Sequence, residues 1–295
     1  MASHAPLKFK GIRPGQGVKP GTTLRILGVG DSITVGFLSD IEGGDGNGYR
    51  LKLREDLSSG SVLFYESRNT ILTNPQEDRV VFAGTETMHG TMREGYYAAW
   101  NGMTIKFMSD NIGPSLAQRP NIVLIHAGTN DMNPNPDVAR EGSEPHATAD
   151  RLGQLIDQVV QTCPDATVLV AKIIGCYDPV QMGNIALFNA VIHDVVQSRQ
   201  SAGKHVLTVD FSSFPMNALR DGIHPTNQGY RLFGDYWYDF ITQIPGDWIK
   251  EPVGDDPRRS GELRRDAPVK GRSTSLCDRL FGLFFGSEPE LVSKA

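Results

Sequence analysis

Short, continuous apolar runs separated by amphipathic helices are the feature that most constrains the fold of this 295-residue chain. The runs show little alternation of polar and apolar residues, which is typical of strands covered on both faces. Strands that alternate with helices favour a parallel sheet joined by right-handed crossovers. We therefore expect an α/β fold with strands at residues 24–29, 62–66, 79–84, 121–128, 167–174 and 205–210.

Three other segments repeat apolar residues with the period of a helix that buries one face. They lie at residues 152–160, 185–196 and 230–241, and we expect Thr226 to cap the start of the third helix. Residues 67–78 show no such period and are expected to form a surface loop.

Composition excludes several classes of function. The formal net charge is −5, so nothing favours a nucleic-acid partner. No apolar run is long enough to span a bilayer, and the N-terminus lacks the apolar core of a signal peptide. Cys163 and Cys176 flank one strand, too far apart to bridge, and Cys277 is a third cysteine. Free thiols favour a cytoplasmic location, with secretion by another route left open.

The chain divides into three regions by composition. Residues 1–21 form an N-terminal extension, residues 22–250 carry the periodic segments, and residues 251–295 form a charged tail that we expect to be flexible. A short apolar segment at 276–285 could dock as a helix on the body of the protein or contact a partner.

Candidate functional residues follow the strands, where ligands of parallel sheets bind. The sequence reads GDS at 30–32, GTND at 128–131 and DGIH at 221–224. A serine hydroxyl becomes a nucleophile when a base takes its proton, and His224 with Asp221 three residues before it can supply that base. The side-chain amide of Asn130 can donate to a developing oxyanion.

Each motif alone also has a structural explanation. Asn130 and Asp131 could cap the following turn, and the motif at His224 could belong to the helix start behind it. Among the other histidines, His126 lies inside an apolar strand and is expected to be a core residue. His193 and His205 are expected to be structural or surface groups.

Together and in this order, the three motifs resemble those of the SGNH hydrolases, also called GDSL-like esterases and lipases. The resemblance covers residues 22–242 and implies a flavodoxin-like three-layer α/β/α sandwich with a parallel five-stranded sheet. It implies Ser32 as the nucleophile, His224 as the base and Asp221 as the acid that orients it. The glycines beside Ser32 would let substrate approach the backbone.

The resemblance also implies an oxyanion hole made by the Ser32 N–H, a glycine N–H and the Asn130 amide. The stretch REGYYAAWNGMTIKFM is similar to the family block that supplies this glycine. Gly102, which precedes MTIKFM, matches it best, and Gly95 is the second choice.

Further residues resemble the family-three carbohydrate esterases, which remove acetyl groups from xylan. They are Gly48-Tyr49-Arg50 with Leu53, HAGTND at 126–131, and Gly229-Tyr230. The resemblance implies a serine esterase for short acyl esters, including those of carbohydrates, without a cofactor or metal. A lipase or thioesterase, or a binding module without catalysis, are the alternatives. Tyr96, Tyr97 and Trp100 could stack on a sugar ring or pack in the core.

Overall fold

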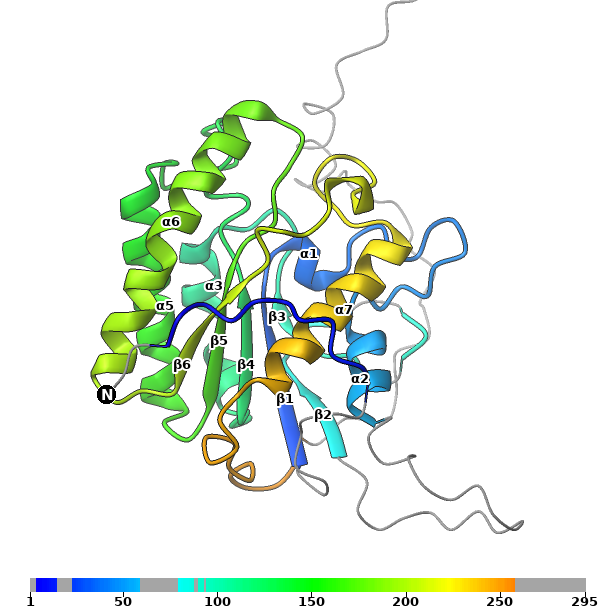
Figure 1. Ribbon diagram of the computed structural model, residues 1–295, viewed down its shortest axis with the longest axis vertical. Helices are drawn as coiled ribbons and strands as arrows, with labels where there is room; N and C mark the ends of the chain where they lie inside the picture. Colours follow the sequence, from blue (N-terminus) through cyan, green and yellow to red (C-terminus); the bar gives the residue numbers. More distant parts are fainter. Residues whose placement is uncertain (1–3, 15–22, 59–78, 88–89, 93, 258–295) are drawn as a thin grey trace, which may run out of the picture. The chain divides into compact units, whose positions relative to one another are not determined.

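The computed structural model describes residues 4–14, 23–58, 79–87, 90–92 and 94–257 (Figure 1). The expected strand at 62–66, the expected loop at 67–78 and the apolar segment at 276–285 lie outside these residues. Among the described residues, no helix has the length and hydropathy needed to cross a bilayer.

The strands form one parallel sheet in the order β2-β1-β4-β5-β6, with the short β3 paired to β1 beyond the end of β2 (Figure 1). This confirms the expected α/β fold. The two residues of β3 are too few to give a periodic pattern, so the sequence did not predict it. The strands are β1 (Thr23–Gly30), β2 (Arg79–Ala83), β3 (Ala98–Ala99), β4 (Ile122–His126), β5 (Thr167–Lys172) and β6 (Val206–Asp210).

Helices cover both faces of the sheet (Figure 1), which explains why the strands are continuously apolar. In β1, Leu24 and Ile26 pack toward one face, while Leu27 and Val29 pack toward the other. The first face is covered by α2 (Arg50–Ser58) and α7 (Asn227–Thr242). The second is covered by α3 (Ile105–Asn111), α4 (Gly113–Leu116), α5 (Pro145–Thr162) and α6 (Pro179–Ser201).

The three helices expected from periodicity are α5, α6 and α7, and all three are confirmed. The Thr226 hydroxyl accepts a hydrogen bond from Gly229 N at 2.9 Å and so caps α7 as expected. Cys163 and Cys176 are both buried free thiols, and they do not bridge, as their separation along the chain predicted.

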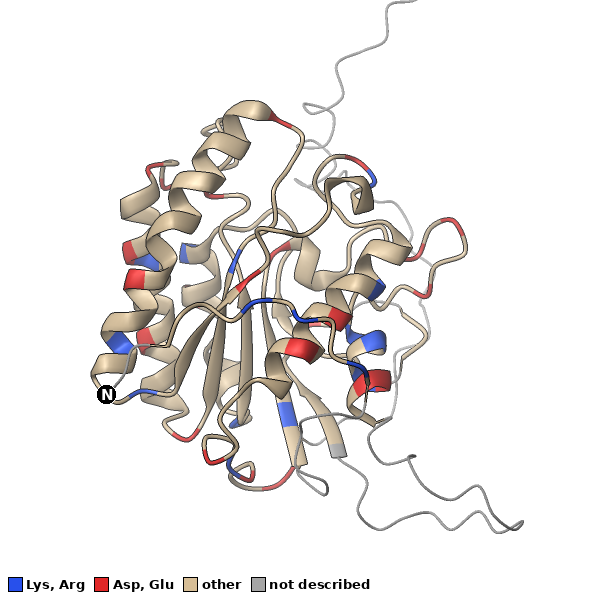
Figure 2. Ribbon diagram, viewed as in Figure 1, with Lys and Arg blue, Asp and Glu red and all other residues tan. Residues whose placement is uncertain are grey.

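Charged residues lie mainly on the outer helices and loops (Figure 2), and Arg25 on β1 is an exception. Only 2% of Arg25 is exposed. Its guanidinium donates to the carbonyls of Val253 and Gly254 at 3.0 Å and pairs with Asp256 at 2.9 Å. A buried guanidinium needs such acceptors, so residues 253–256 are bonded to the start of the sheet.

The N-terminal segment is bonded to β6, the strand at one edge of the sheet. Leu7 pairs in parallel with Val209 of β6, with hydrogen bonds of 2.8 Å to Thr208 O and 2.9 Å from Asp210 N. Phe9 stacks on Tyr236 of α7 with ring centroids 3.9 Å apart. Part of the expected N-terminal extension therefore extends the sheet.

The sheet order creates a switch point between β1 and β4. The chain leaves β1 toward β2 and β3 on one side, then crosses to β4 on the other. Diverging connections leave a crevice beyond the carboxyl ends of these two strands. Ser32 follows β1 and Asn130 follows β4, so both lie at this crevice.

The expectation that the glycines beside Ser32 let substrate approach the backbone is wrong. Protein atoms already occupy the space that side chains at these positions would fill. A Cβ on Gly30 would lie 2.3 Å from both His126 O and Thr34 Oγ1. A Cβ on Gly28 would lie 2.6 Å from the Tyr49 hydroxyl. These glycines allow close packing of the strands and of α1 (Ser32–Val35), so substrate approach does not explain them.

Gly30→Ala is therefore expected to lower the free energy of unfolding by at least ~2 kcal/mol, because a backbone carbonyl must move. Gly183→Ala is the matched control, since no heavy atom lies within 4 Å of its Cβ position in α6. That change should stabilise the protein by ~0.5–1 kcal/mol. Denaturant unfolding of both variants measures the difference, and equal stabilities would contradict this account of Gly30.

Candidate active site

Ser32 begins the single-turn helix α1 directly after β1. The Asp31 carboxylate caps this helix by accepting a hydrogen bond from Ile33 N at 3.0 Å. At the other end, Gly36 has φ of +89° and donates its N–H to Ser32 O at 3.0 Å. A residue in this left-handed conformation ends the helix after one turn, so glycine is favoured there.

Arg50 at the start of α2 supports α1 from behind. Its guanidinium donates to Thr34 O at 2.6 Å and to Val35 O at 3.1 Å, and only 2% of Arg50 is exposed. It lies 4.4 Å from the centre of the Tyr97 ring. Tyr97 is 3% exposed, so of its two expected roles the structure supports packing in the core and not stacking on a sugar.

His224 lies on the loop of residues 221–224, hereafter the Asp221–His224 loop. The imidazole Nε2 is 2.8 Å from Ser32 Oγ, and Nδ1 is 2.7 Å from Asp221 Oδ2. Asp221 Oδ1 also accepts the N–H groups of Ile223 at 3.0 Å and His224 at 2.7 Å. The carboxylate thus holds both the backbone turn and the ring, as the D-x-x-H spacing predicted.

The hydrogen bonds among Asp221, His224 and Ser32 indicate which ring nitrogen of His224 carries the proton. A carboxylate accepts the Nδ1–H of His224, which leaves Nε2 unprotonated and able to accept the Ser32 hydroxyl proton. Burial opposes the ionisation of Asp221, but hydrogen bonds from His224 and Ile223 outweigh it and lower the Asp221 pKa to about 2. An ionised carboxylate, an imidazole and a serine in this order can activate the hydroxyl for attack on a carbonyl.

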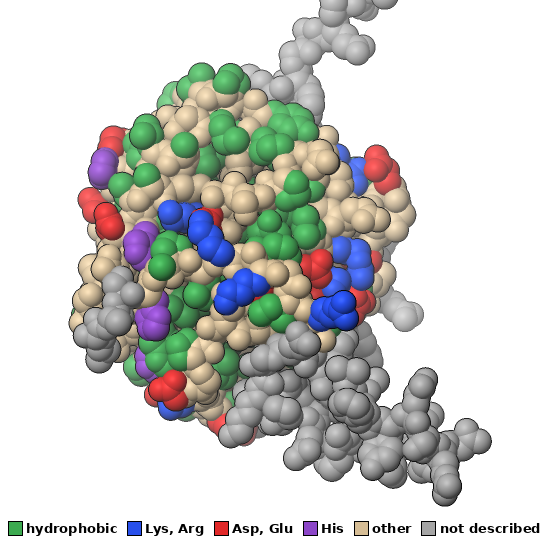
Figure 3. Space-filling model, in the orientation of Figure 1, with side chains coloured by type: hydrophobic (Ala, Val, Ile, Leu, Met, Phe, Trp, Pro, Cys, Tyr) green, Lys and Arg blue, Asp and Glu red, His purple; other side chains and the backbone are tan. Residues whose placement is uncertain are grey.

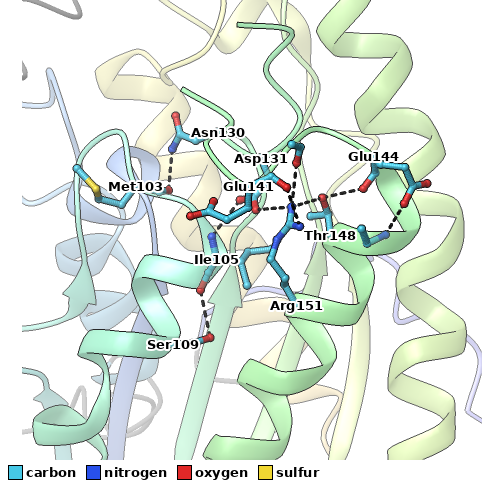
Figure 4. A network of polar contacts seen from close by, with 11 residues as sticks. Met103, Ile105, Ser109, Asn130, Asp131, Glu141, Glu144, Thr148 and Arg151 are labelled. Carbon is cyan, nitrogen blue, oxygen red and sulfur yellow. Dashed lines mark hydrogen bonds and ion pairs between the residues drawn. The ribbon is translucent and has the colours of Figure 1, made fainter. Parts of the chain in front are cut away.

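The loop after β4 is joined to the loop after β3 by two side chains (Figure 4). The Asn130 amide donates to Met103 O at 3.0 Å. Asp131 Oδ2 accepts the N–H of Ile105, the first residue of α3, at 3.0 Å. Asp131 therefore caps a helix that precedes it in the chain, and does not cap its own following turn. Ser32 and these two loops border the same crevice.

Arg151 on α5 holds Asp131 in place (Figure 4). Its guanidinium lies 3.2 Å from Asp131 Oδ1 and also donates to Gly142 O at 3.0 Å and Thr148 Oγ1 at 2.7 Å. Asp131 is 1% exposed. Burial raises the Asp131 pKa, and the Ile105 N–H and Arg151 oppose this rise.

Helix α6 holds the same loop from its other side. Gln181 donates to Thr129 O at 2.8 Å, and Asn184 donates to Met132 O at 3.1 Å. The backbone on both sides of Asn130 is therefore bonded to α6. Such fixed loops allow a side-chain amide to be directed at one point in the crevice.

The structure places the two candidate glycines differently. Gly102 follows β3 by three residues, has φ of +70°, and has no heavy atom within 4 Å of the position that a Cβ would take. Since Ala99 pairs with Gly30 and Trp100 N donates to Gly30 O at 3.2 Å, this turn lies near the start of α1. Gly95 lies against Met92 and Arg50, behind α1.

Three other described histidines have structural contacts. His126 is 1% exposed, its Nε2 accepts the N–H of Ile174 at 3.2 Å, and burial lowers its pKa to about 3. His193 lies 3.3 Å from Thr208 Oγ1, and His205 stacks on Trp248. Among the described residues, no group of three or more His, Cys, Asp or Glu side chains could hold a metal ion.

Comparison with known proteins gives the family. Residues 29–232 match the GDSL-like lipase/acylhydrolase family, which is more than half of the chain. The chain belongs to the GDSL-like lipase/acylhydrolase family. It is therefore an ester hydrolase, with the fold that members of the family share.

Two relatives and two solved structures are similar to this chain. A putative endoglucanase X of Acetivibrio thermocellus is 29% identical over 54% of this chain and 71% of that protein. A multidomain esterase of Ruminococcus flavefaciens is 28% identical over 76% of this chain but only 29% of that protein. A family 3 carbohydrate esterase of Clostridium thermocellum has a TM-score of 0.57 and 25% identity over 75% of this chain and 98% of that one. A family 3 carbohydrate esterase from Talaromyces cellulolyticus has a TM-score of 0.56 and 20% identity over the same shares, which shows the fold alone.

Sequence patterns did not identify Arg50, Arg151 and Gln181 as supports of the site. Each forms bonds to backbone or side chains 15 to 52 residues away in the chain. Such contacts leave no periodic or local signal. The only available hint was Arg50, which lies in the Gly48-Tyr49-Arg50 stretch that resembles the carbohydrate esterases.

Asp31 gives a prediction about pH. Burial raises its pKa to about 6, although the Ile33 N–H, Thr129 and the charge of His224 oppose the rise. Because the folded state holds this proton more tightly than the unfolded chain does, Asp31 favours folding below about pH 4. That contribution is lost as the pH rises through 6.

Asp31→Asn keeps an oxygen that can accept the Ile33 N–H and removes the ionisable group. We expect it to raise the free energy of unfolding at pH 8 by up to ~3 kcal/mol relative to wild type, and to change it little at pH 4. Denaturant unfolding at both pH values measures this effect. The exposed Asp137→Asn is the control, and a gain at pH 4 equal to that at pH 8 would count against the explanation.

Arg151→Met tests the support of the Asn130 loop. It leaves a buried Asp131 without its cationic partner, so we expect the free energy of unfolding to fall by about 3 kcal/mol. The exposed Arg140→Met is the control and should change stability by less than ~0.5 kcal/mol. Similar losses of unfolding free energy in the two variants would show that the Asp131–Arg151 contact contributes no more to stability than an exposed arginine does.

Proposed function

We propose that this chain hydrolyses acetyl and other short-chain acyl esters of carbohydrates through an acyl-enzyme on Ser32. The observation that carries the proposal is the 2.8 Å hydrogen bond between His224 Nε2 and Ser32 Oγ, with Asp221 on the other ring nitrogen. A serine aligned with an oriented imidazole is the arrangement that nucleophilic acyl transfer requires.

In the first step, Ser32 Oγ attacks the ester carbonyl carbon while His224 Nε2 takes the hydroxyl proton. The imidazolium is stabilised by Asp221, and it then gives this proton to the alcohol oxygen as the ester C–O bond breaks. A water molecule next attacks the acyl-enzyme with His224 as base. The carboxylic acid leaves, and Ser32 regains its proton.

The negative charge on the carbonyl oxygen would be held by the Ser32 N–H, the Gly102 N–H and the Asn130 amide. Ser32 is the first residue of α1, where backbone N–H groups have no acceptor within the helix. One N–H of Asn130 donates to Met103 O, so that the other would donate to the oxyanion. The turn at Gly102 adjoins both groups, and this favours Gly102 over Gly95.

One likeness supports a carbohydrate ester as the substrate, and a second supports ester hydrolysis in general. The family 3 carbohydrate esterase of Clostridium thermocellum covers most of the described domain at 25% identity. The multidomain protein of Ruminococcus flavefaciens is named as an esterase. Neutral substrates are also consistent with the absence of a strong net charge.

The test is hydrolysis of p-nitrophenyl acetate, butyrate and palmitate, and of acetylated xylan, by the wild-type chain and by Ser32→Ala. We expect turnover to fall from acetate to palmitate, and the variant to lose at least ~10³-fold in kcat. A preference for palmitate would favour a lipase instead. If both proteins are equally inactive on all four substrates, the proposal of a short-chain carbohydrate esterase fails.

A further inference from the structure

A cluster of exposed apolar side chains lies beside the Asp221–His224 loop. Among the described residues, Tyr177 is 58% exposed, Val180 59% and Met182 36%. All three follow β5 at the edge of the sheet that carries Ser32. Figure 3 shows apolar side chains gathered at the top of the view, where α6 begins. Apolar surface beside a polar site is typical of ligand binding.

Tyr177 is in direct contact with the loop that carries His224. Its N–H donates to Gly222 O at 2.9 Å, and its ring atoms lie 2.9 Å from the Cβ position of Gly222. Gly222 has φ of +85°, so both conformation and space exclude a side chain at this position. The ring of Tyr177 is thus packed two residues from His224 while more than half of the residue faces solvent.

Two methionines continue the surface from Tyr177. The Tyr177 hydroxyl donates to Met216 O at 3.1 Å. The sulfur atoms of Met182 and Met216 lie 2.9 and 3.2 Å from the Cβ position of Gly175. Tyr177, Met182 and Met216 therefore form one continuous set of side chains, hereafter the apolar rim.

The proposed chemistry determines which part of a bound ester lies on the side of Ser32 where His224 and the apolar rim are found. The alcohol oxygen must receive its proton from His224 Nε2, so the alcohol portion lies on the His224 side of the carbonyl carbon. The carbonyl oxygen points toward Asn130 and Gly102, on other loops. On the His224 side, the neighbours are Phe37, with its ring centroid 5.0 Å from the imidazole, and the apolar rim behind Gly222.

We propose that the apolar rim binds the alcohol portion of the ester, and that Tyr177 determines specificity for a neutral pyranose ring. This rests on the function proposed above. The hydroxyl of Tyr177 is already bonded to Met216, which fixes the ring so that its exposed surface can pack on a flat partner at low entropic cost. Asp178 and Asp221 lie next to the rim, and their charge disfavours an anionic alcohol.

The test compares two esters that share the acetyl group and differ in the alcohol, namely xylose tetraacetate and ethyl acetate. Tyr177→Ala should lower the ratio of kcat/KM for the sugar ester to that for ethyl acetate by about 3- to 10-fold, the range that aromatic packing supplies. Tyr177→Phe keeps the ring and should restore most of this ratio. Val253→Ala removes an exposed apolar side chain near Arg25, at the other edge of the sheet, and should leave the ratio as in wild type.

A second comparison assigns the rim to one part of the ester. p-Nitrophenyl acetate and butyrate share the alcohol and differ in the acyl group, so Tyr177→Ala should leave their kcat/KM ratio as in wild type. A changed acetate-to-butyrate ratio with an unchanged sugar-to-ethyl ratio would place the acyl group on the rim and overturn the proposal. Equal sugar-to-ethyl ratios in wild type and Tyr177→Ala would overturn it as well.

Binding without turnover separates this proposal from the catalytic one. Calorimetry of Ser32→Ala with xylose tetraacetate should show about 3- to 10-fold weaker binding when Tyr177→Ala is added. If Ser32→Ala retains full turnover, the proposed mechanism fails whatever Tyr177 does. If Ser32→Ala is inactive and the added change leaves binding unaltered, the role of Tyr177 alone fails. Thermal unfolding of Tyr177→Ala checks that the exposed site tolerates the change.

Discussion

The close approach of β1 and β4 at Gly30 is the constraint on which the rest of the site depends. Where a side chain would stand, the carbonyl of His126 and the hydroxyl of Thr34 lie instead. The contact lies at the last residue pair of β1 and β4, and α1 begins two residues later at Ser32. Because β1 and β4 end side by side, Ser32 and the loop with Asn130 lie at the same crevice although they are about one hundred residues apart in the chain.

Around that contact, hydrogen bonds from buried polar side chains hold the loops. Arg50 holds the end of α1, Arg151 and Gln181 hold the loop after β4, and Asp131 holds the start of α3. Each bond is made by a buried or nearly buried group whose polar atoms would be costly to leave unpaired. The segments that carry Ser32 and Asn130 are thus each bonded to a neighbouring helix.

The sequence predicted the layers and the residues of the candidate triad because each has a local signal. Continuous apolar runs mark buried parallel strands, and D-x-x-H encodes a turn that the structure contains. It did not predict β3, whose two residues have no period, or the purpose of Gly28 and Gly30, which depends on Tyr49, Thr34 and His126. It left open whether Tyr97 stacks on a sugar or packs in the core, and the structure shows that it packs against Arg50. It overlooked the exposed Tyr177. Exposure depends on what covers a side chain, and that is known only after folding.

The pairing of Leu7 with β6 has a consequence for self-association. In the order of the sheet, β6 is a terminal strand, and its five residues are apolar apart from Thr208 and Asp210. An uncovered strand of this kind offers free N–H and C=O groups to a strand of another molecule. Leu7 uses two of these groups, and Lys8 adds an ion pair with Asp210. Leu7 and Lys8 thus cover part of the edge of β6, and cutting the chain after Lys8 would expose this edge to other molecules while leaving Ser32 in place.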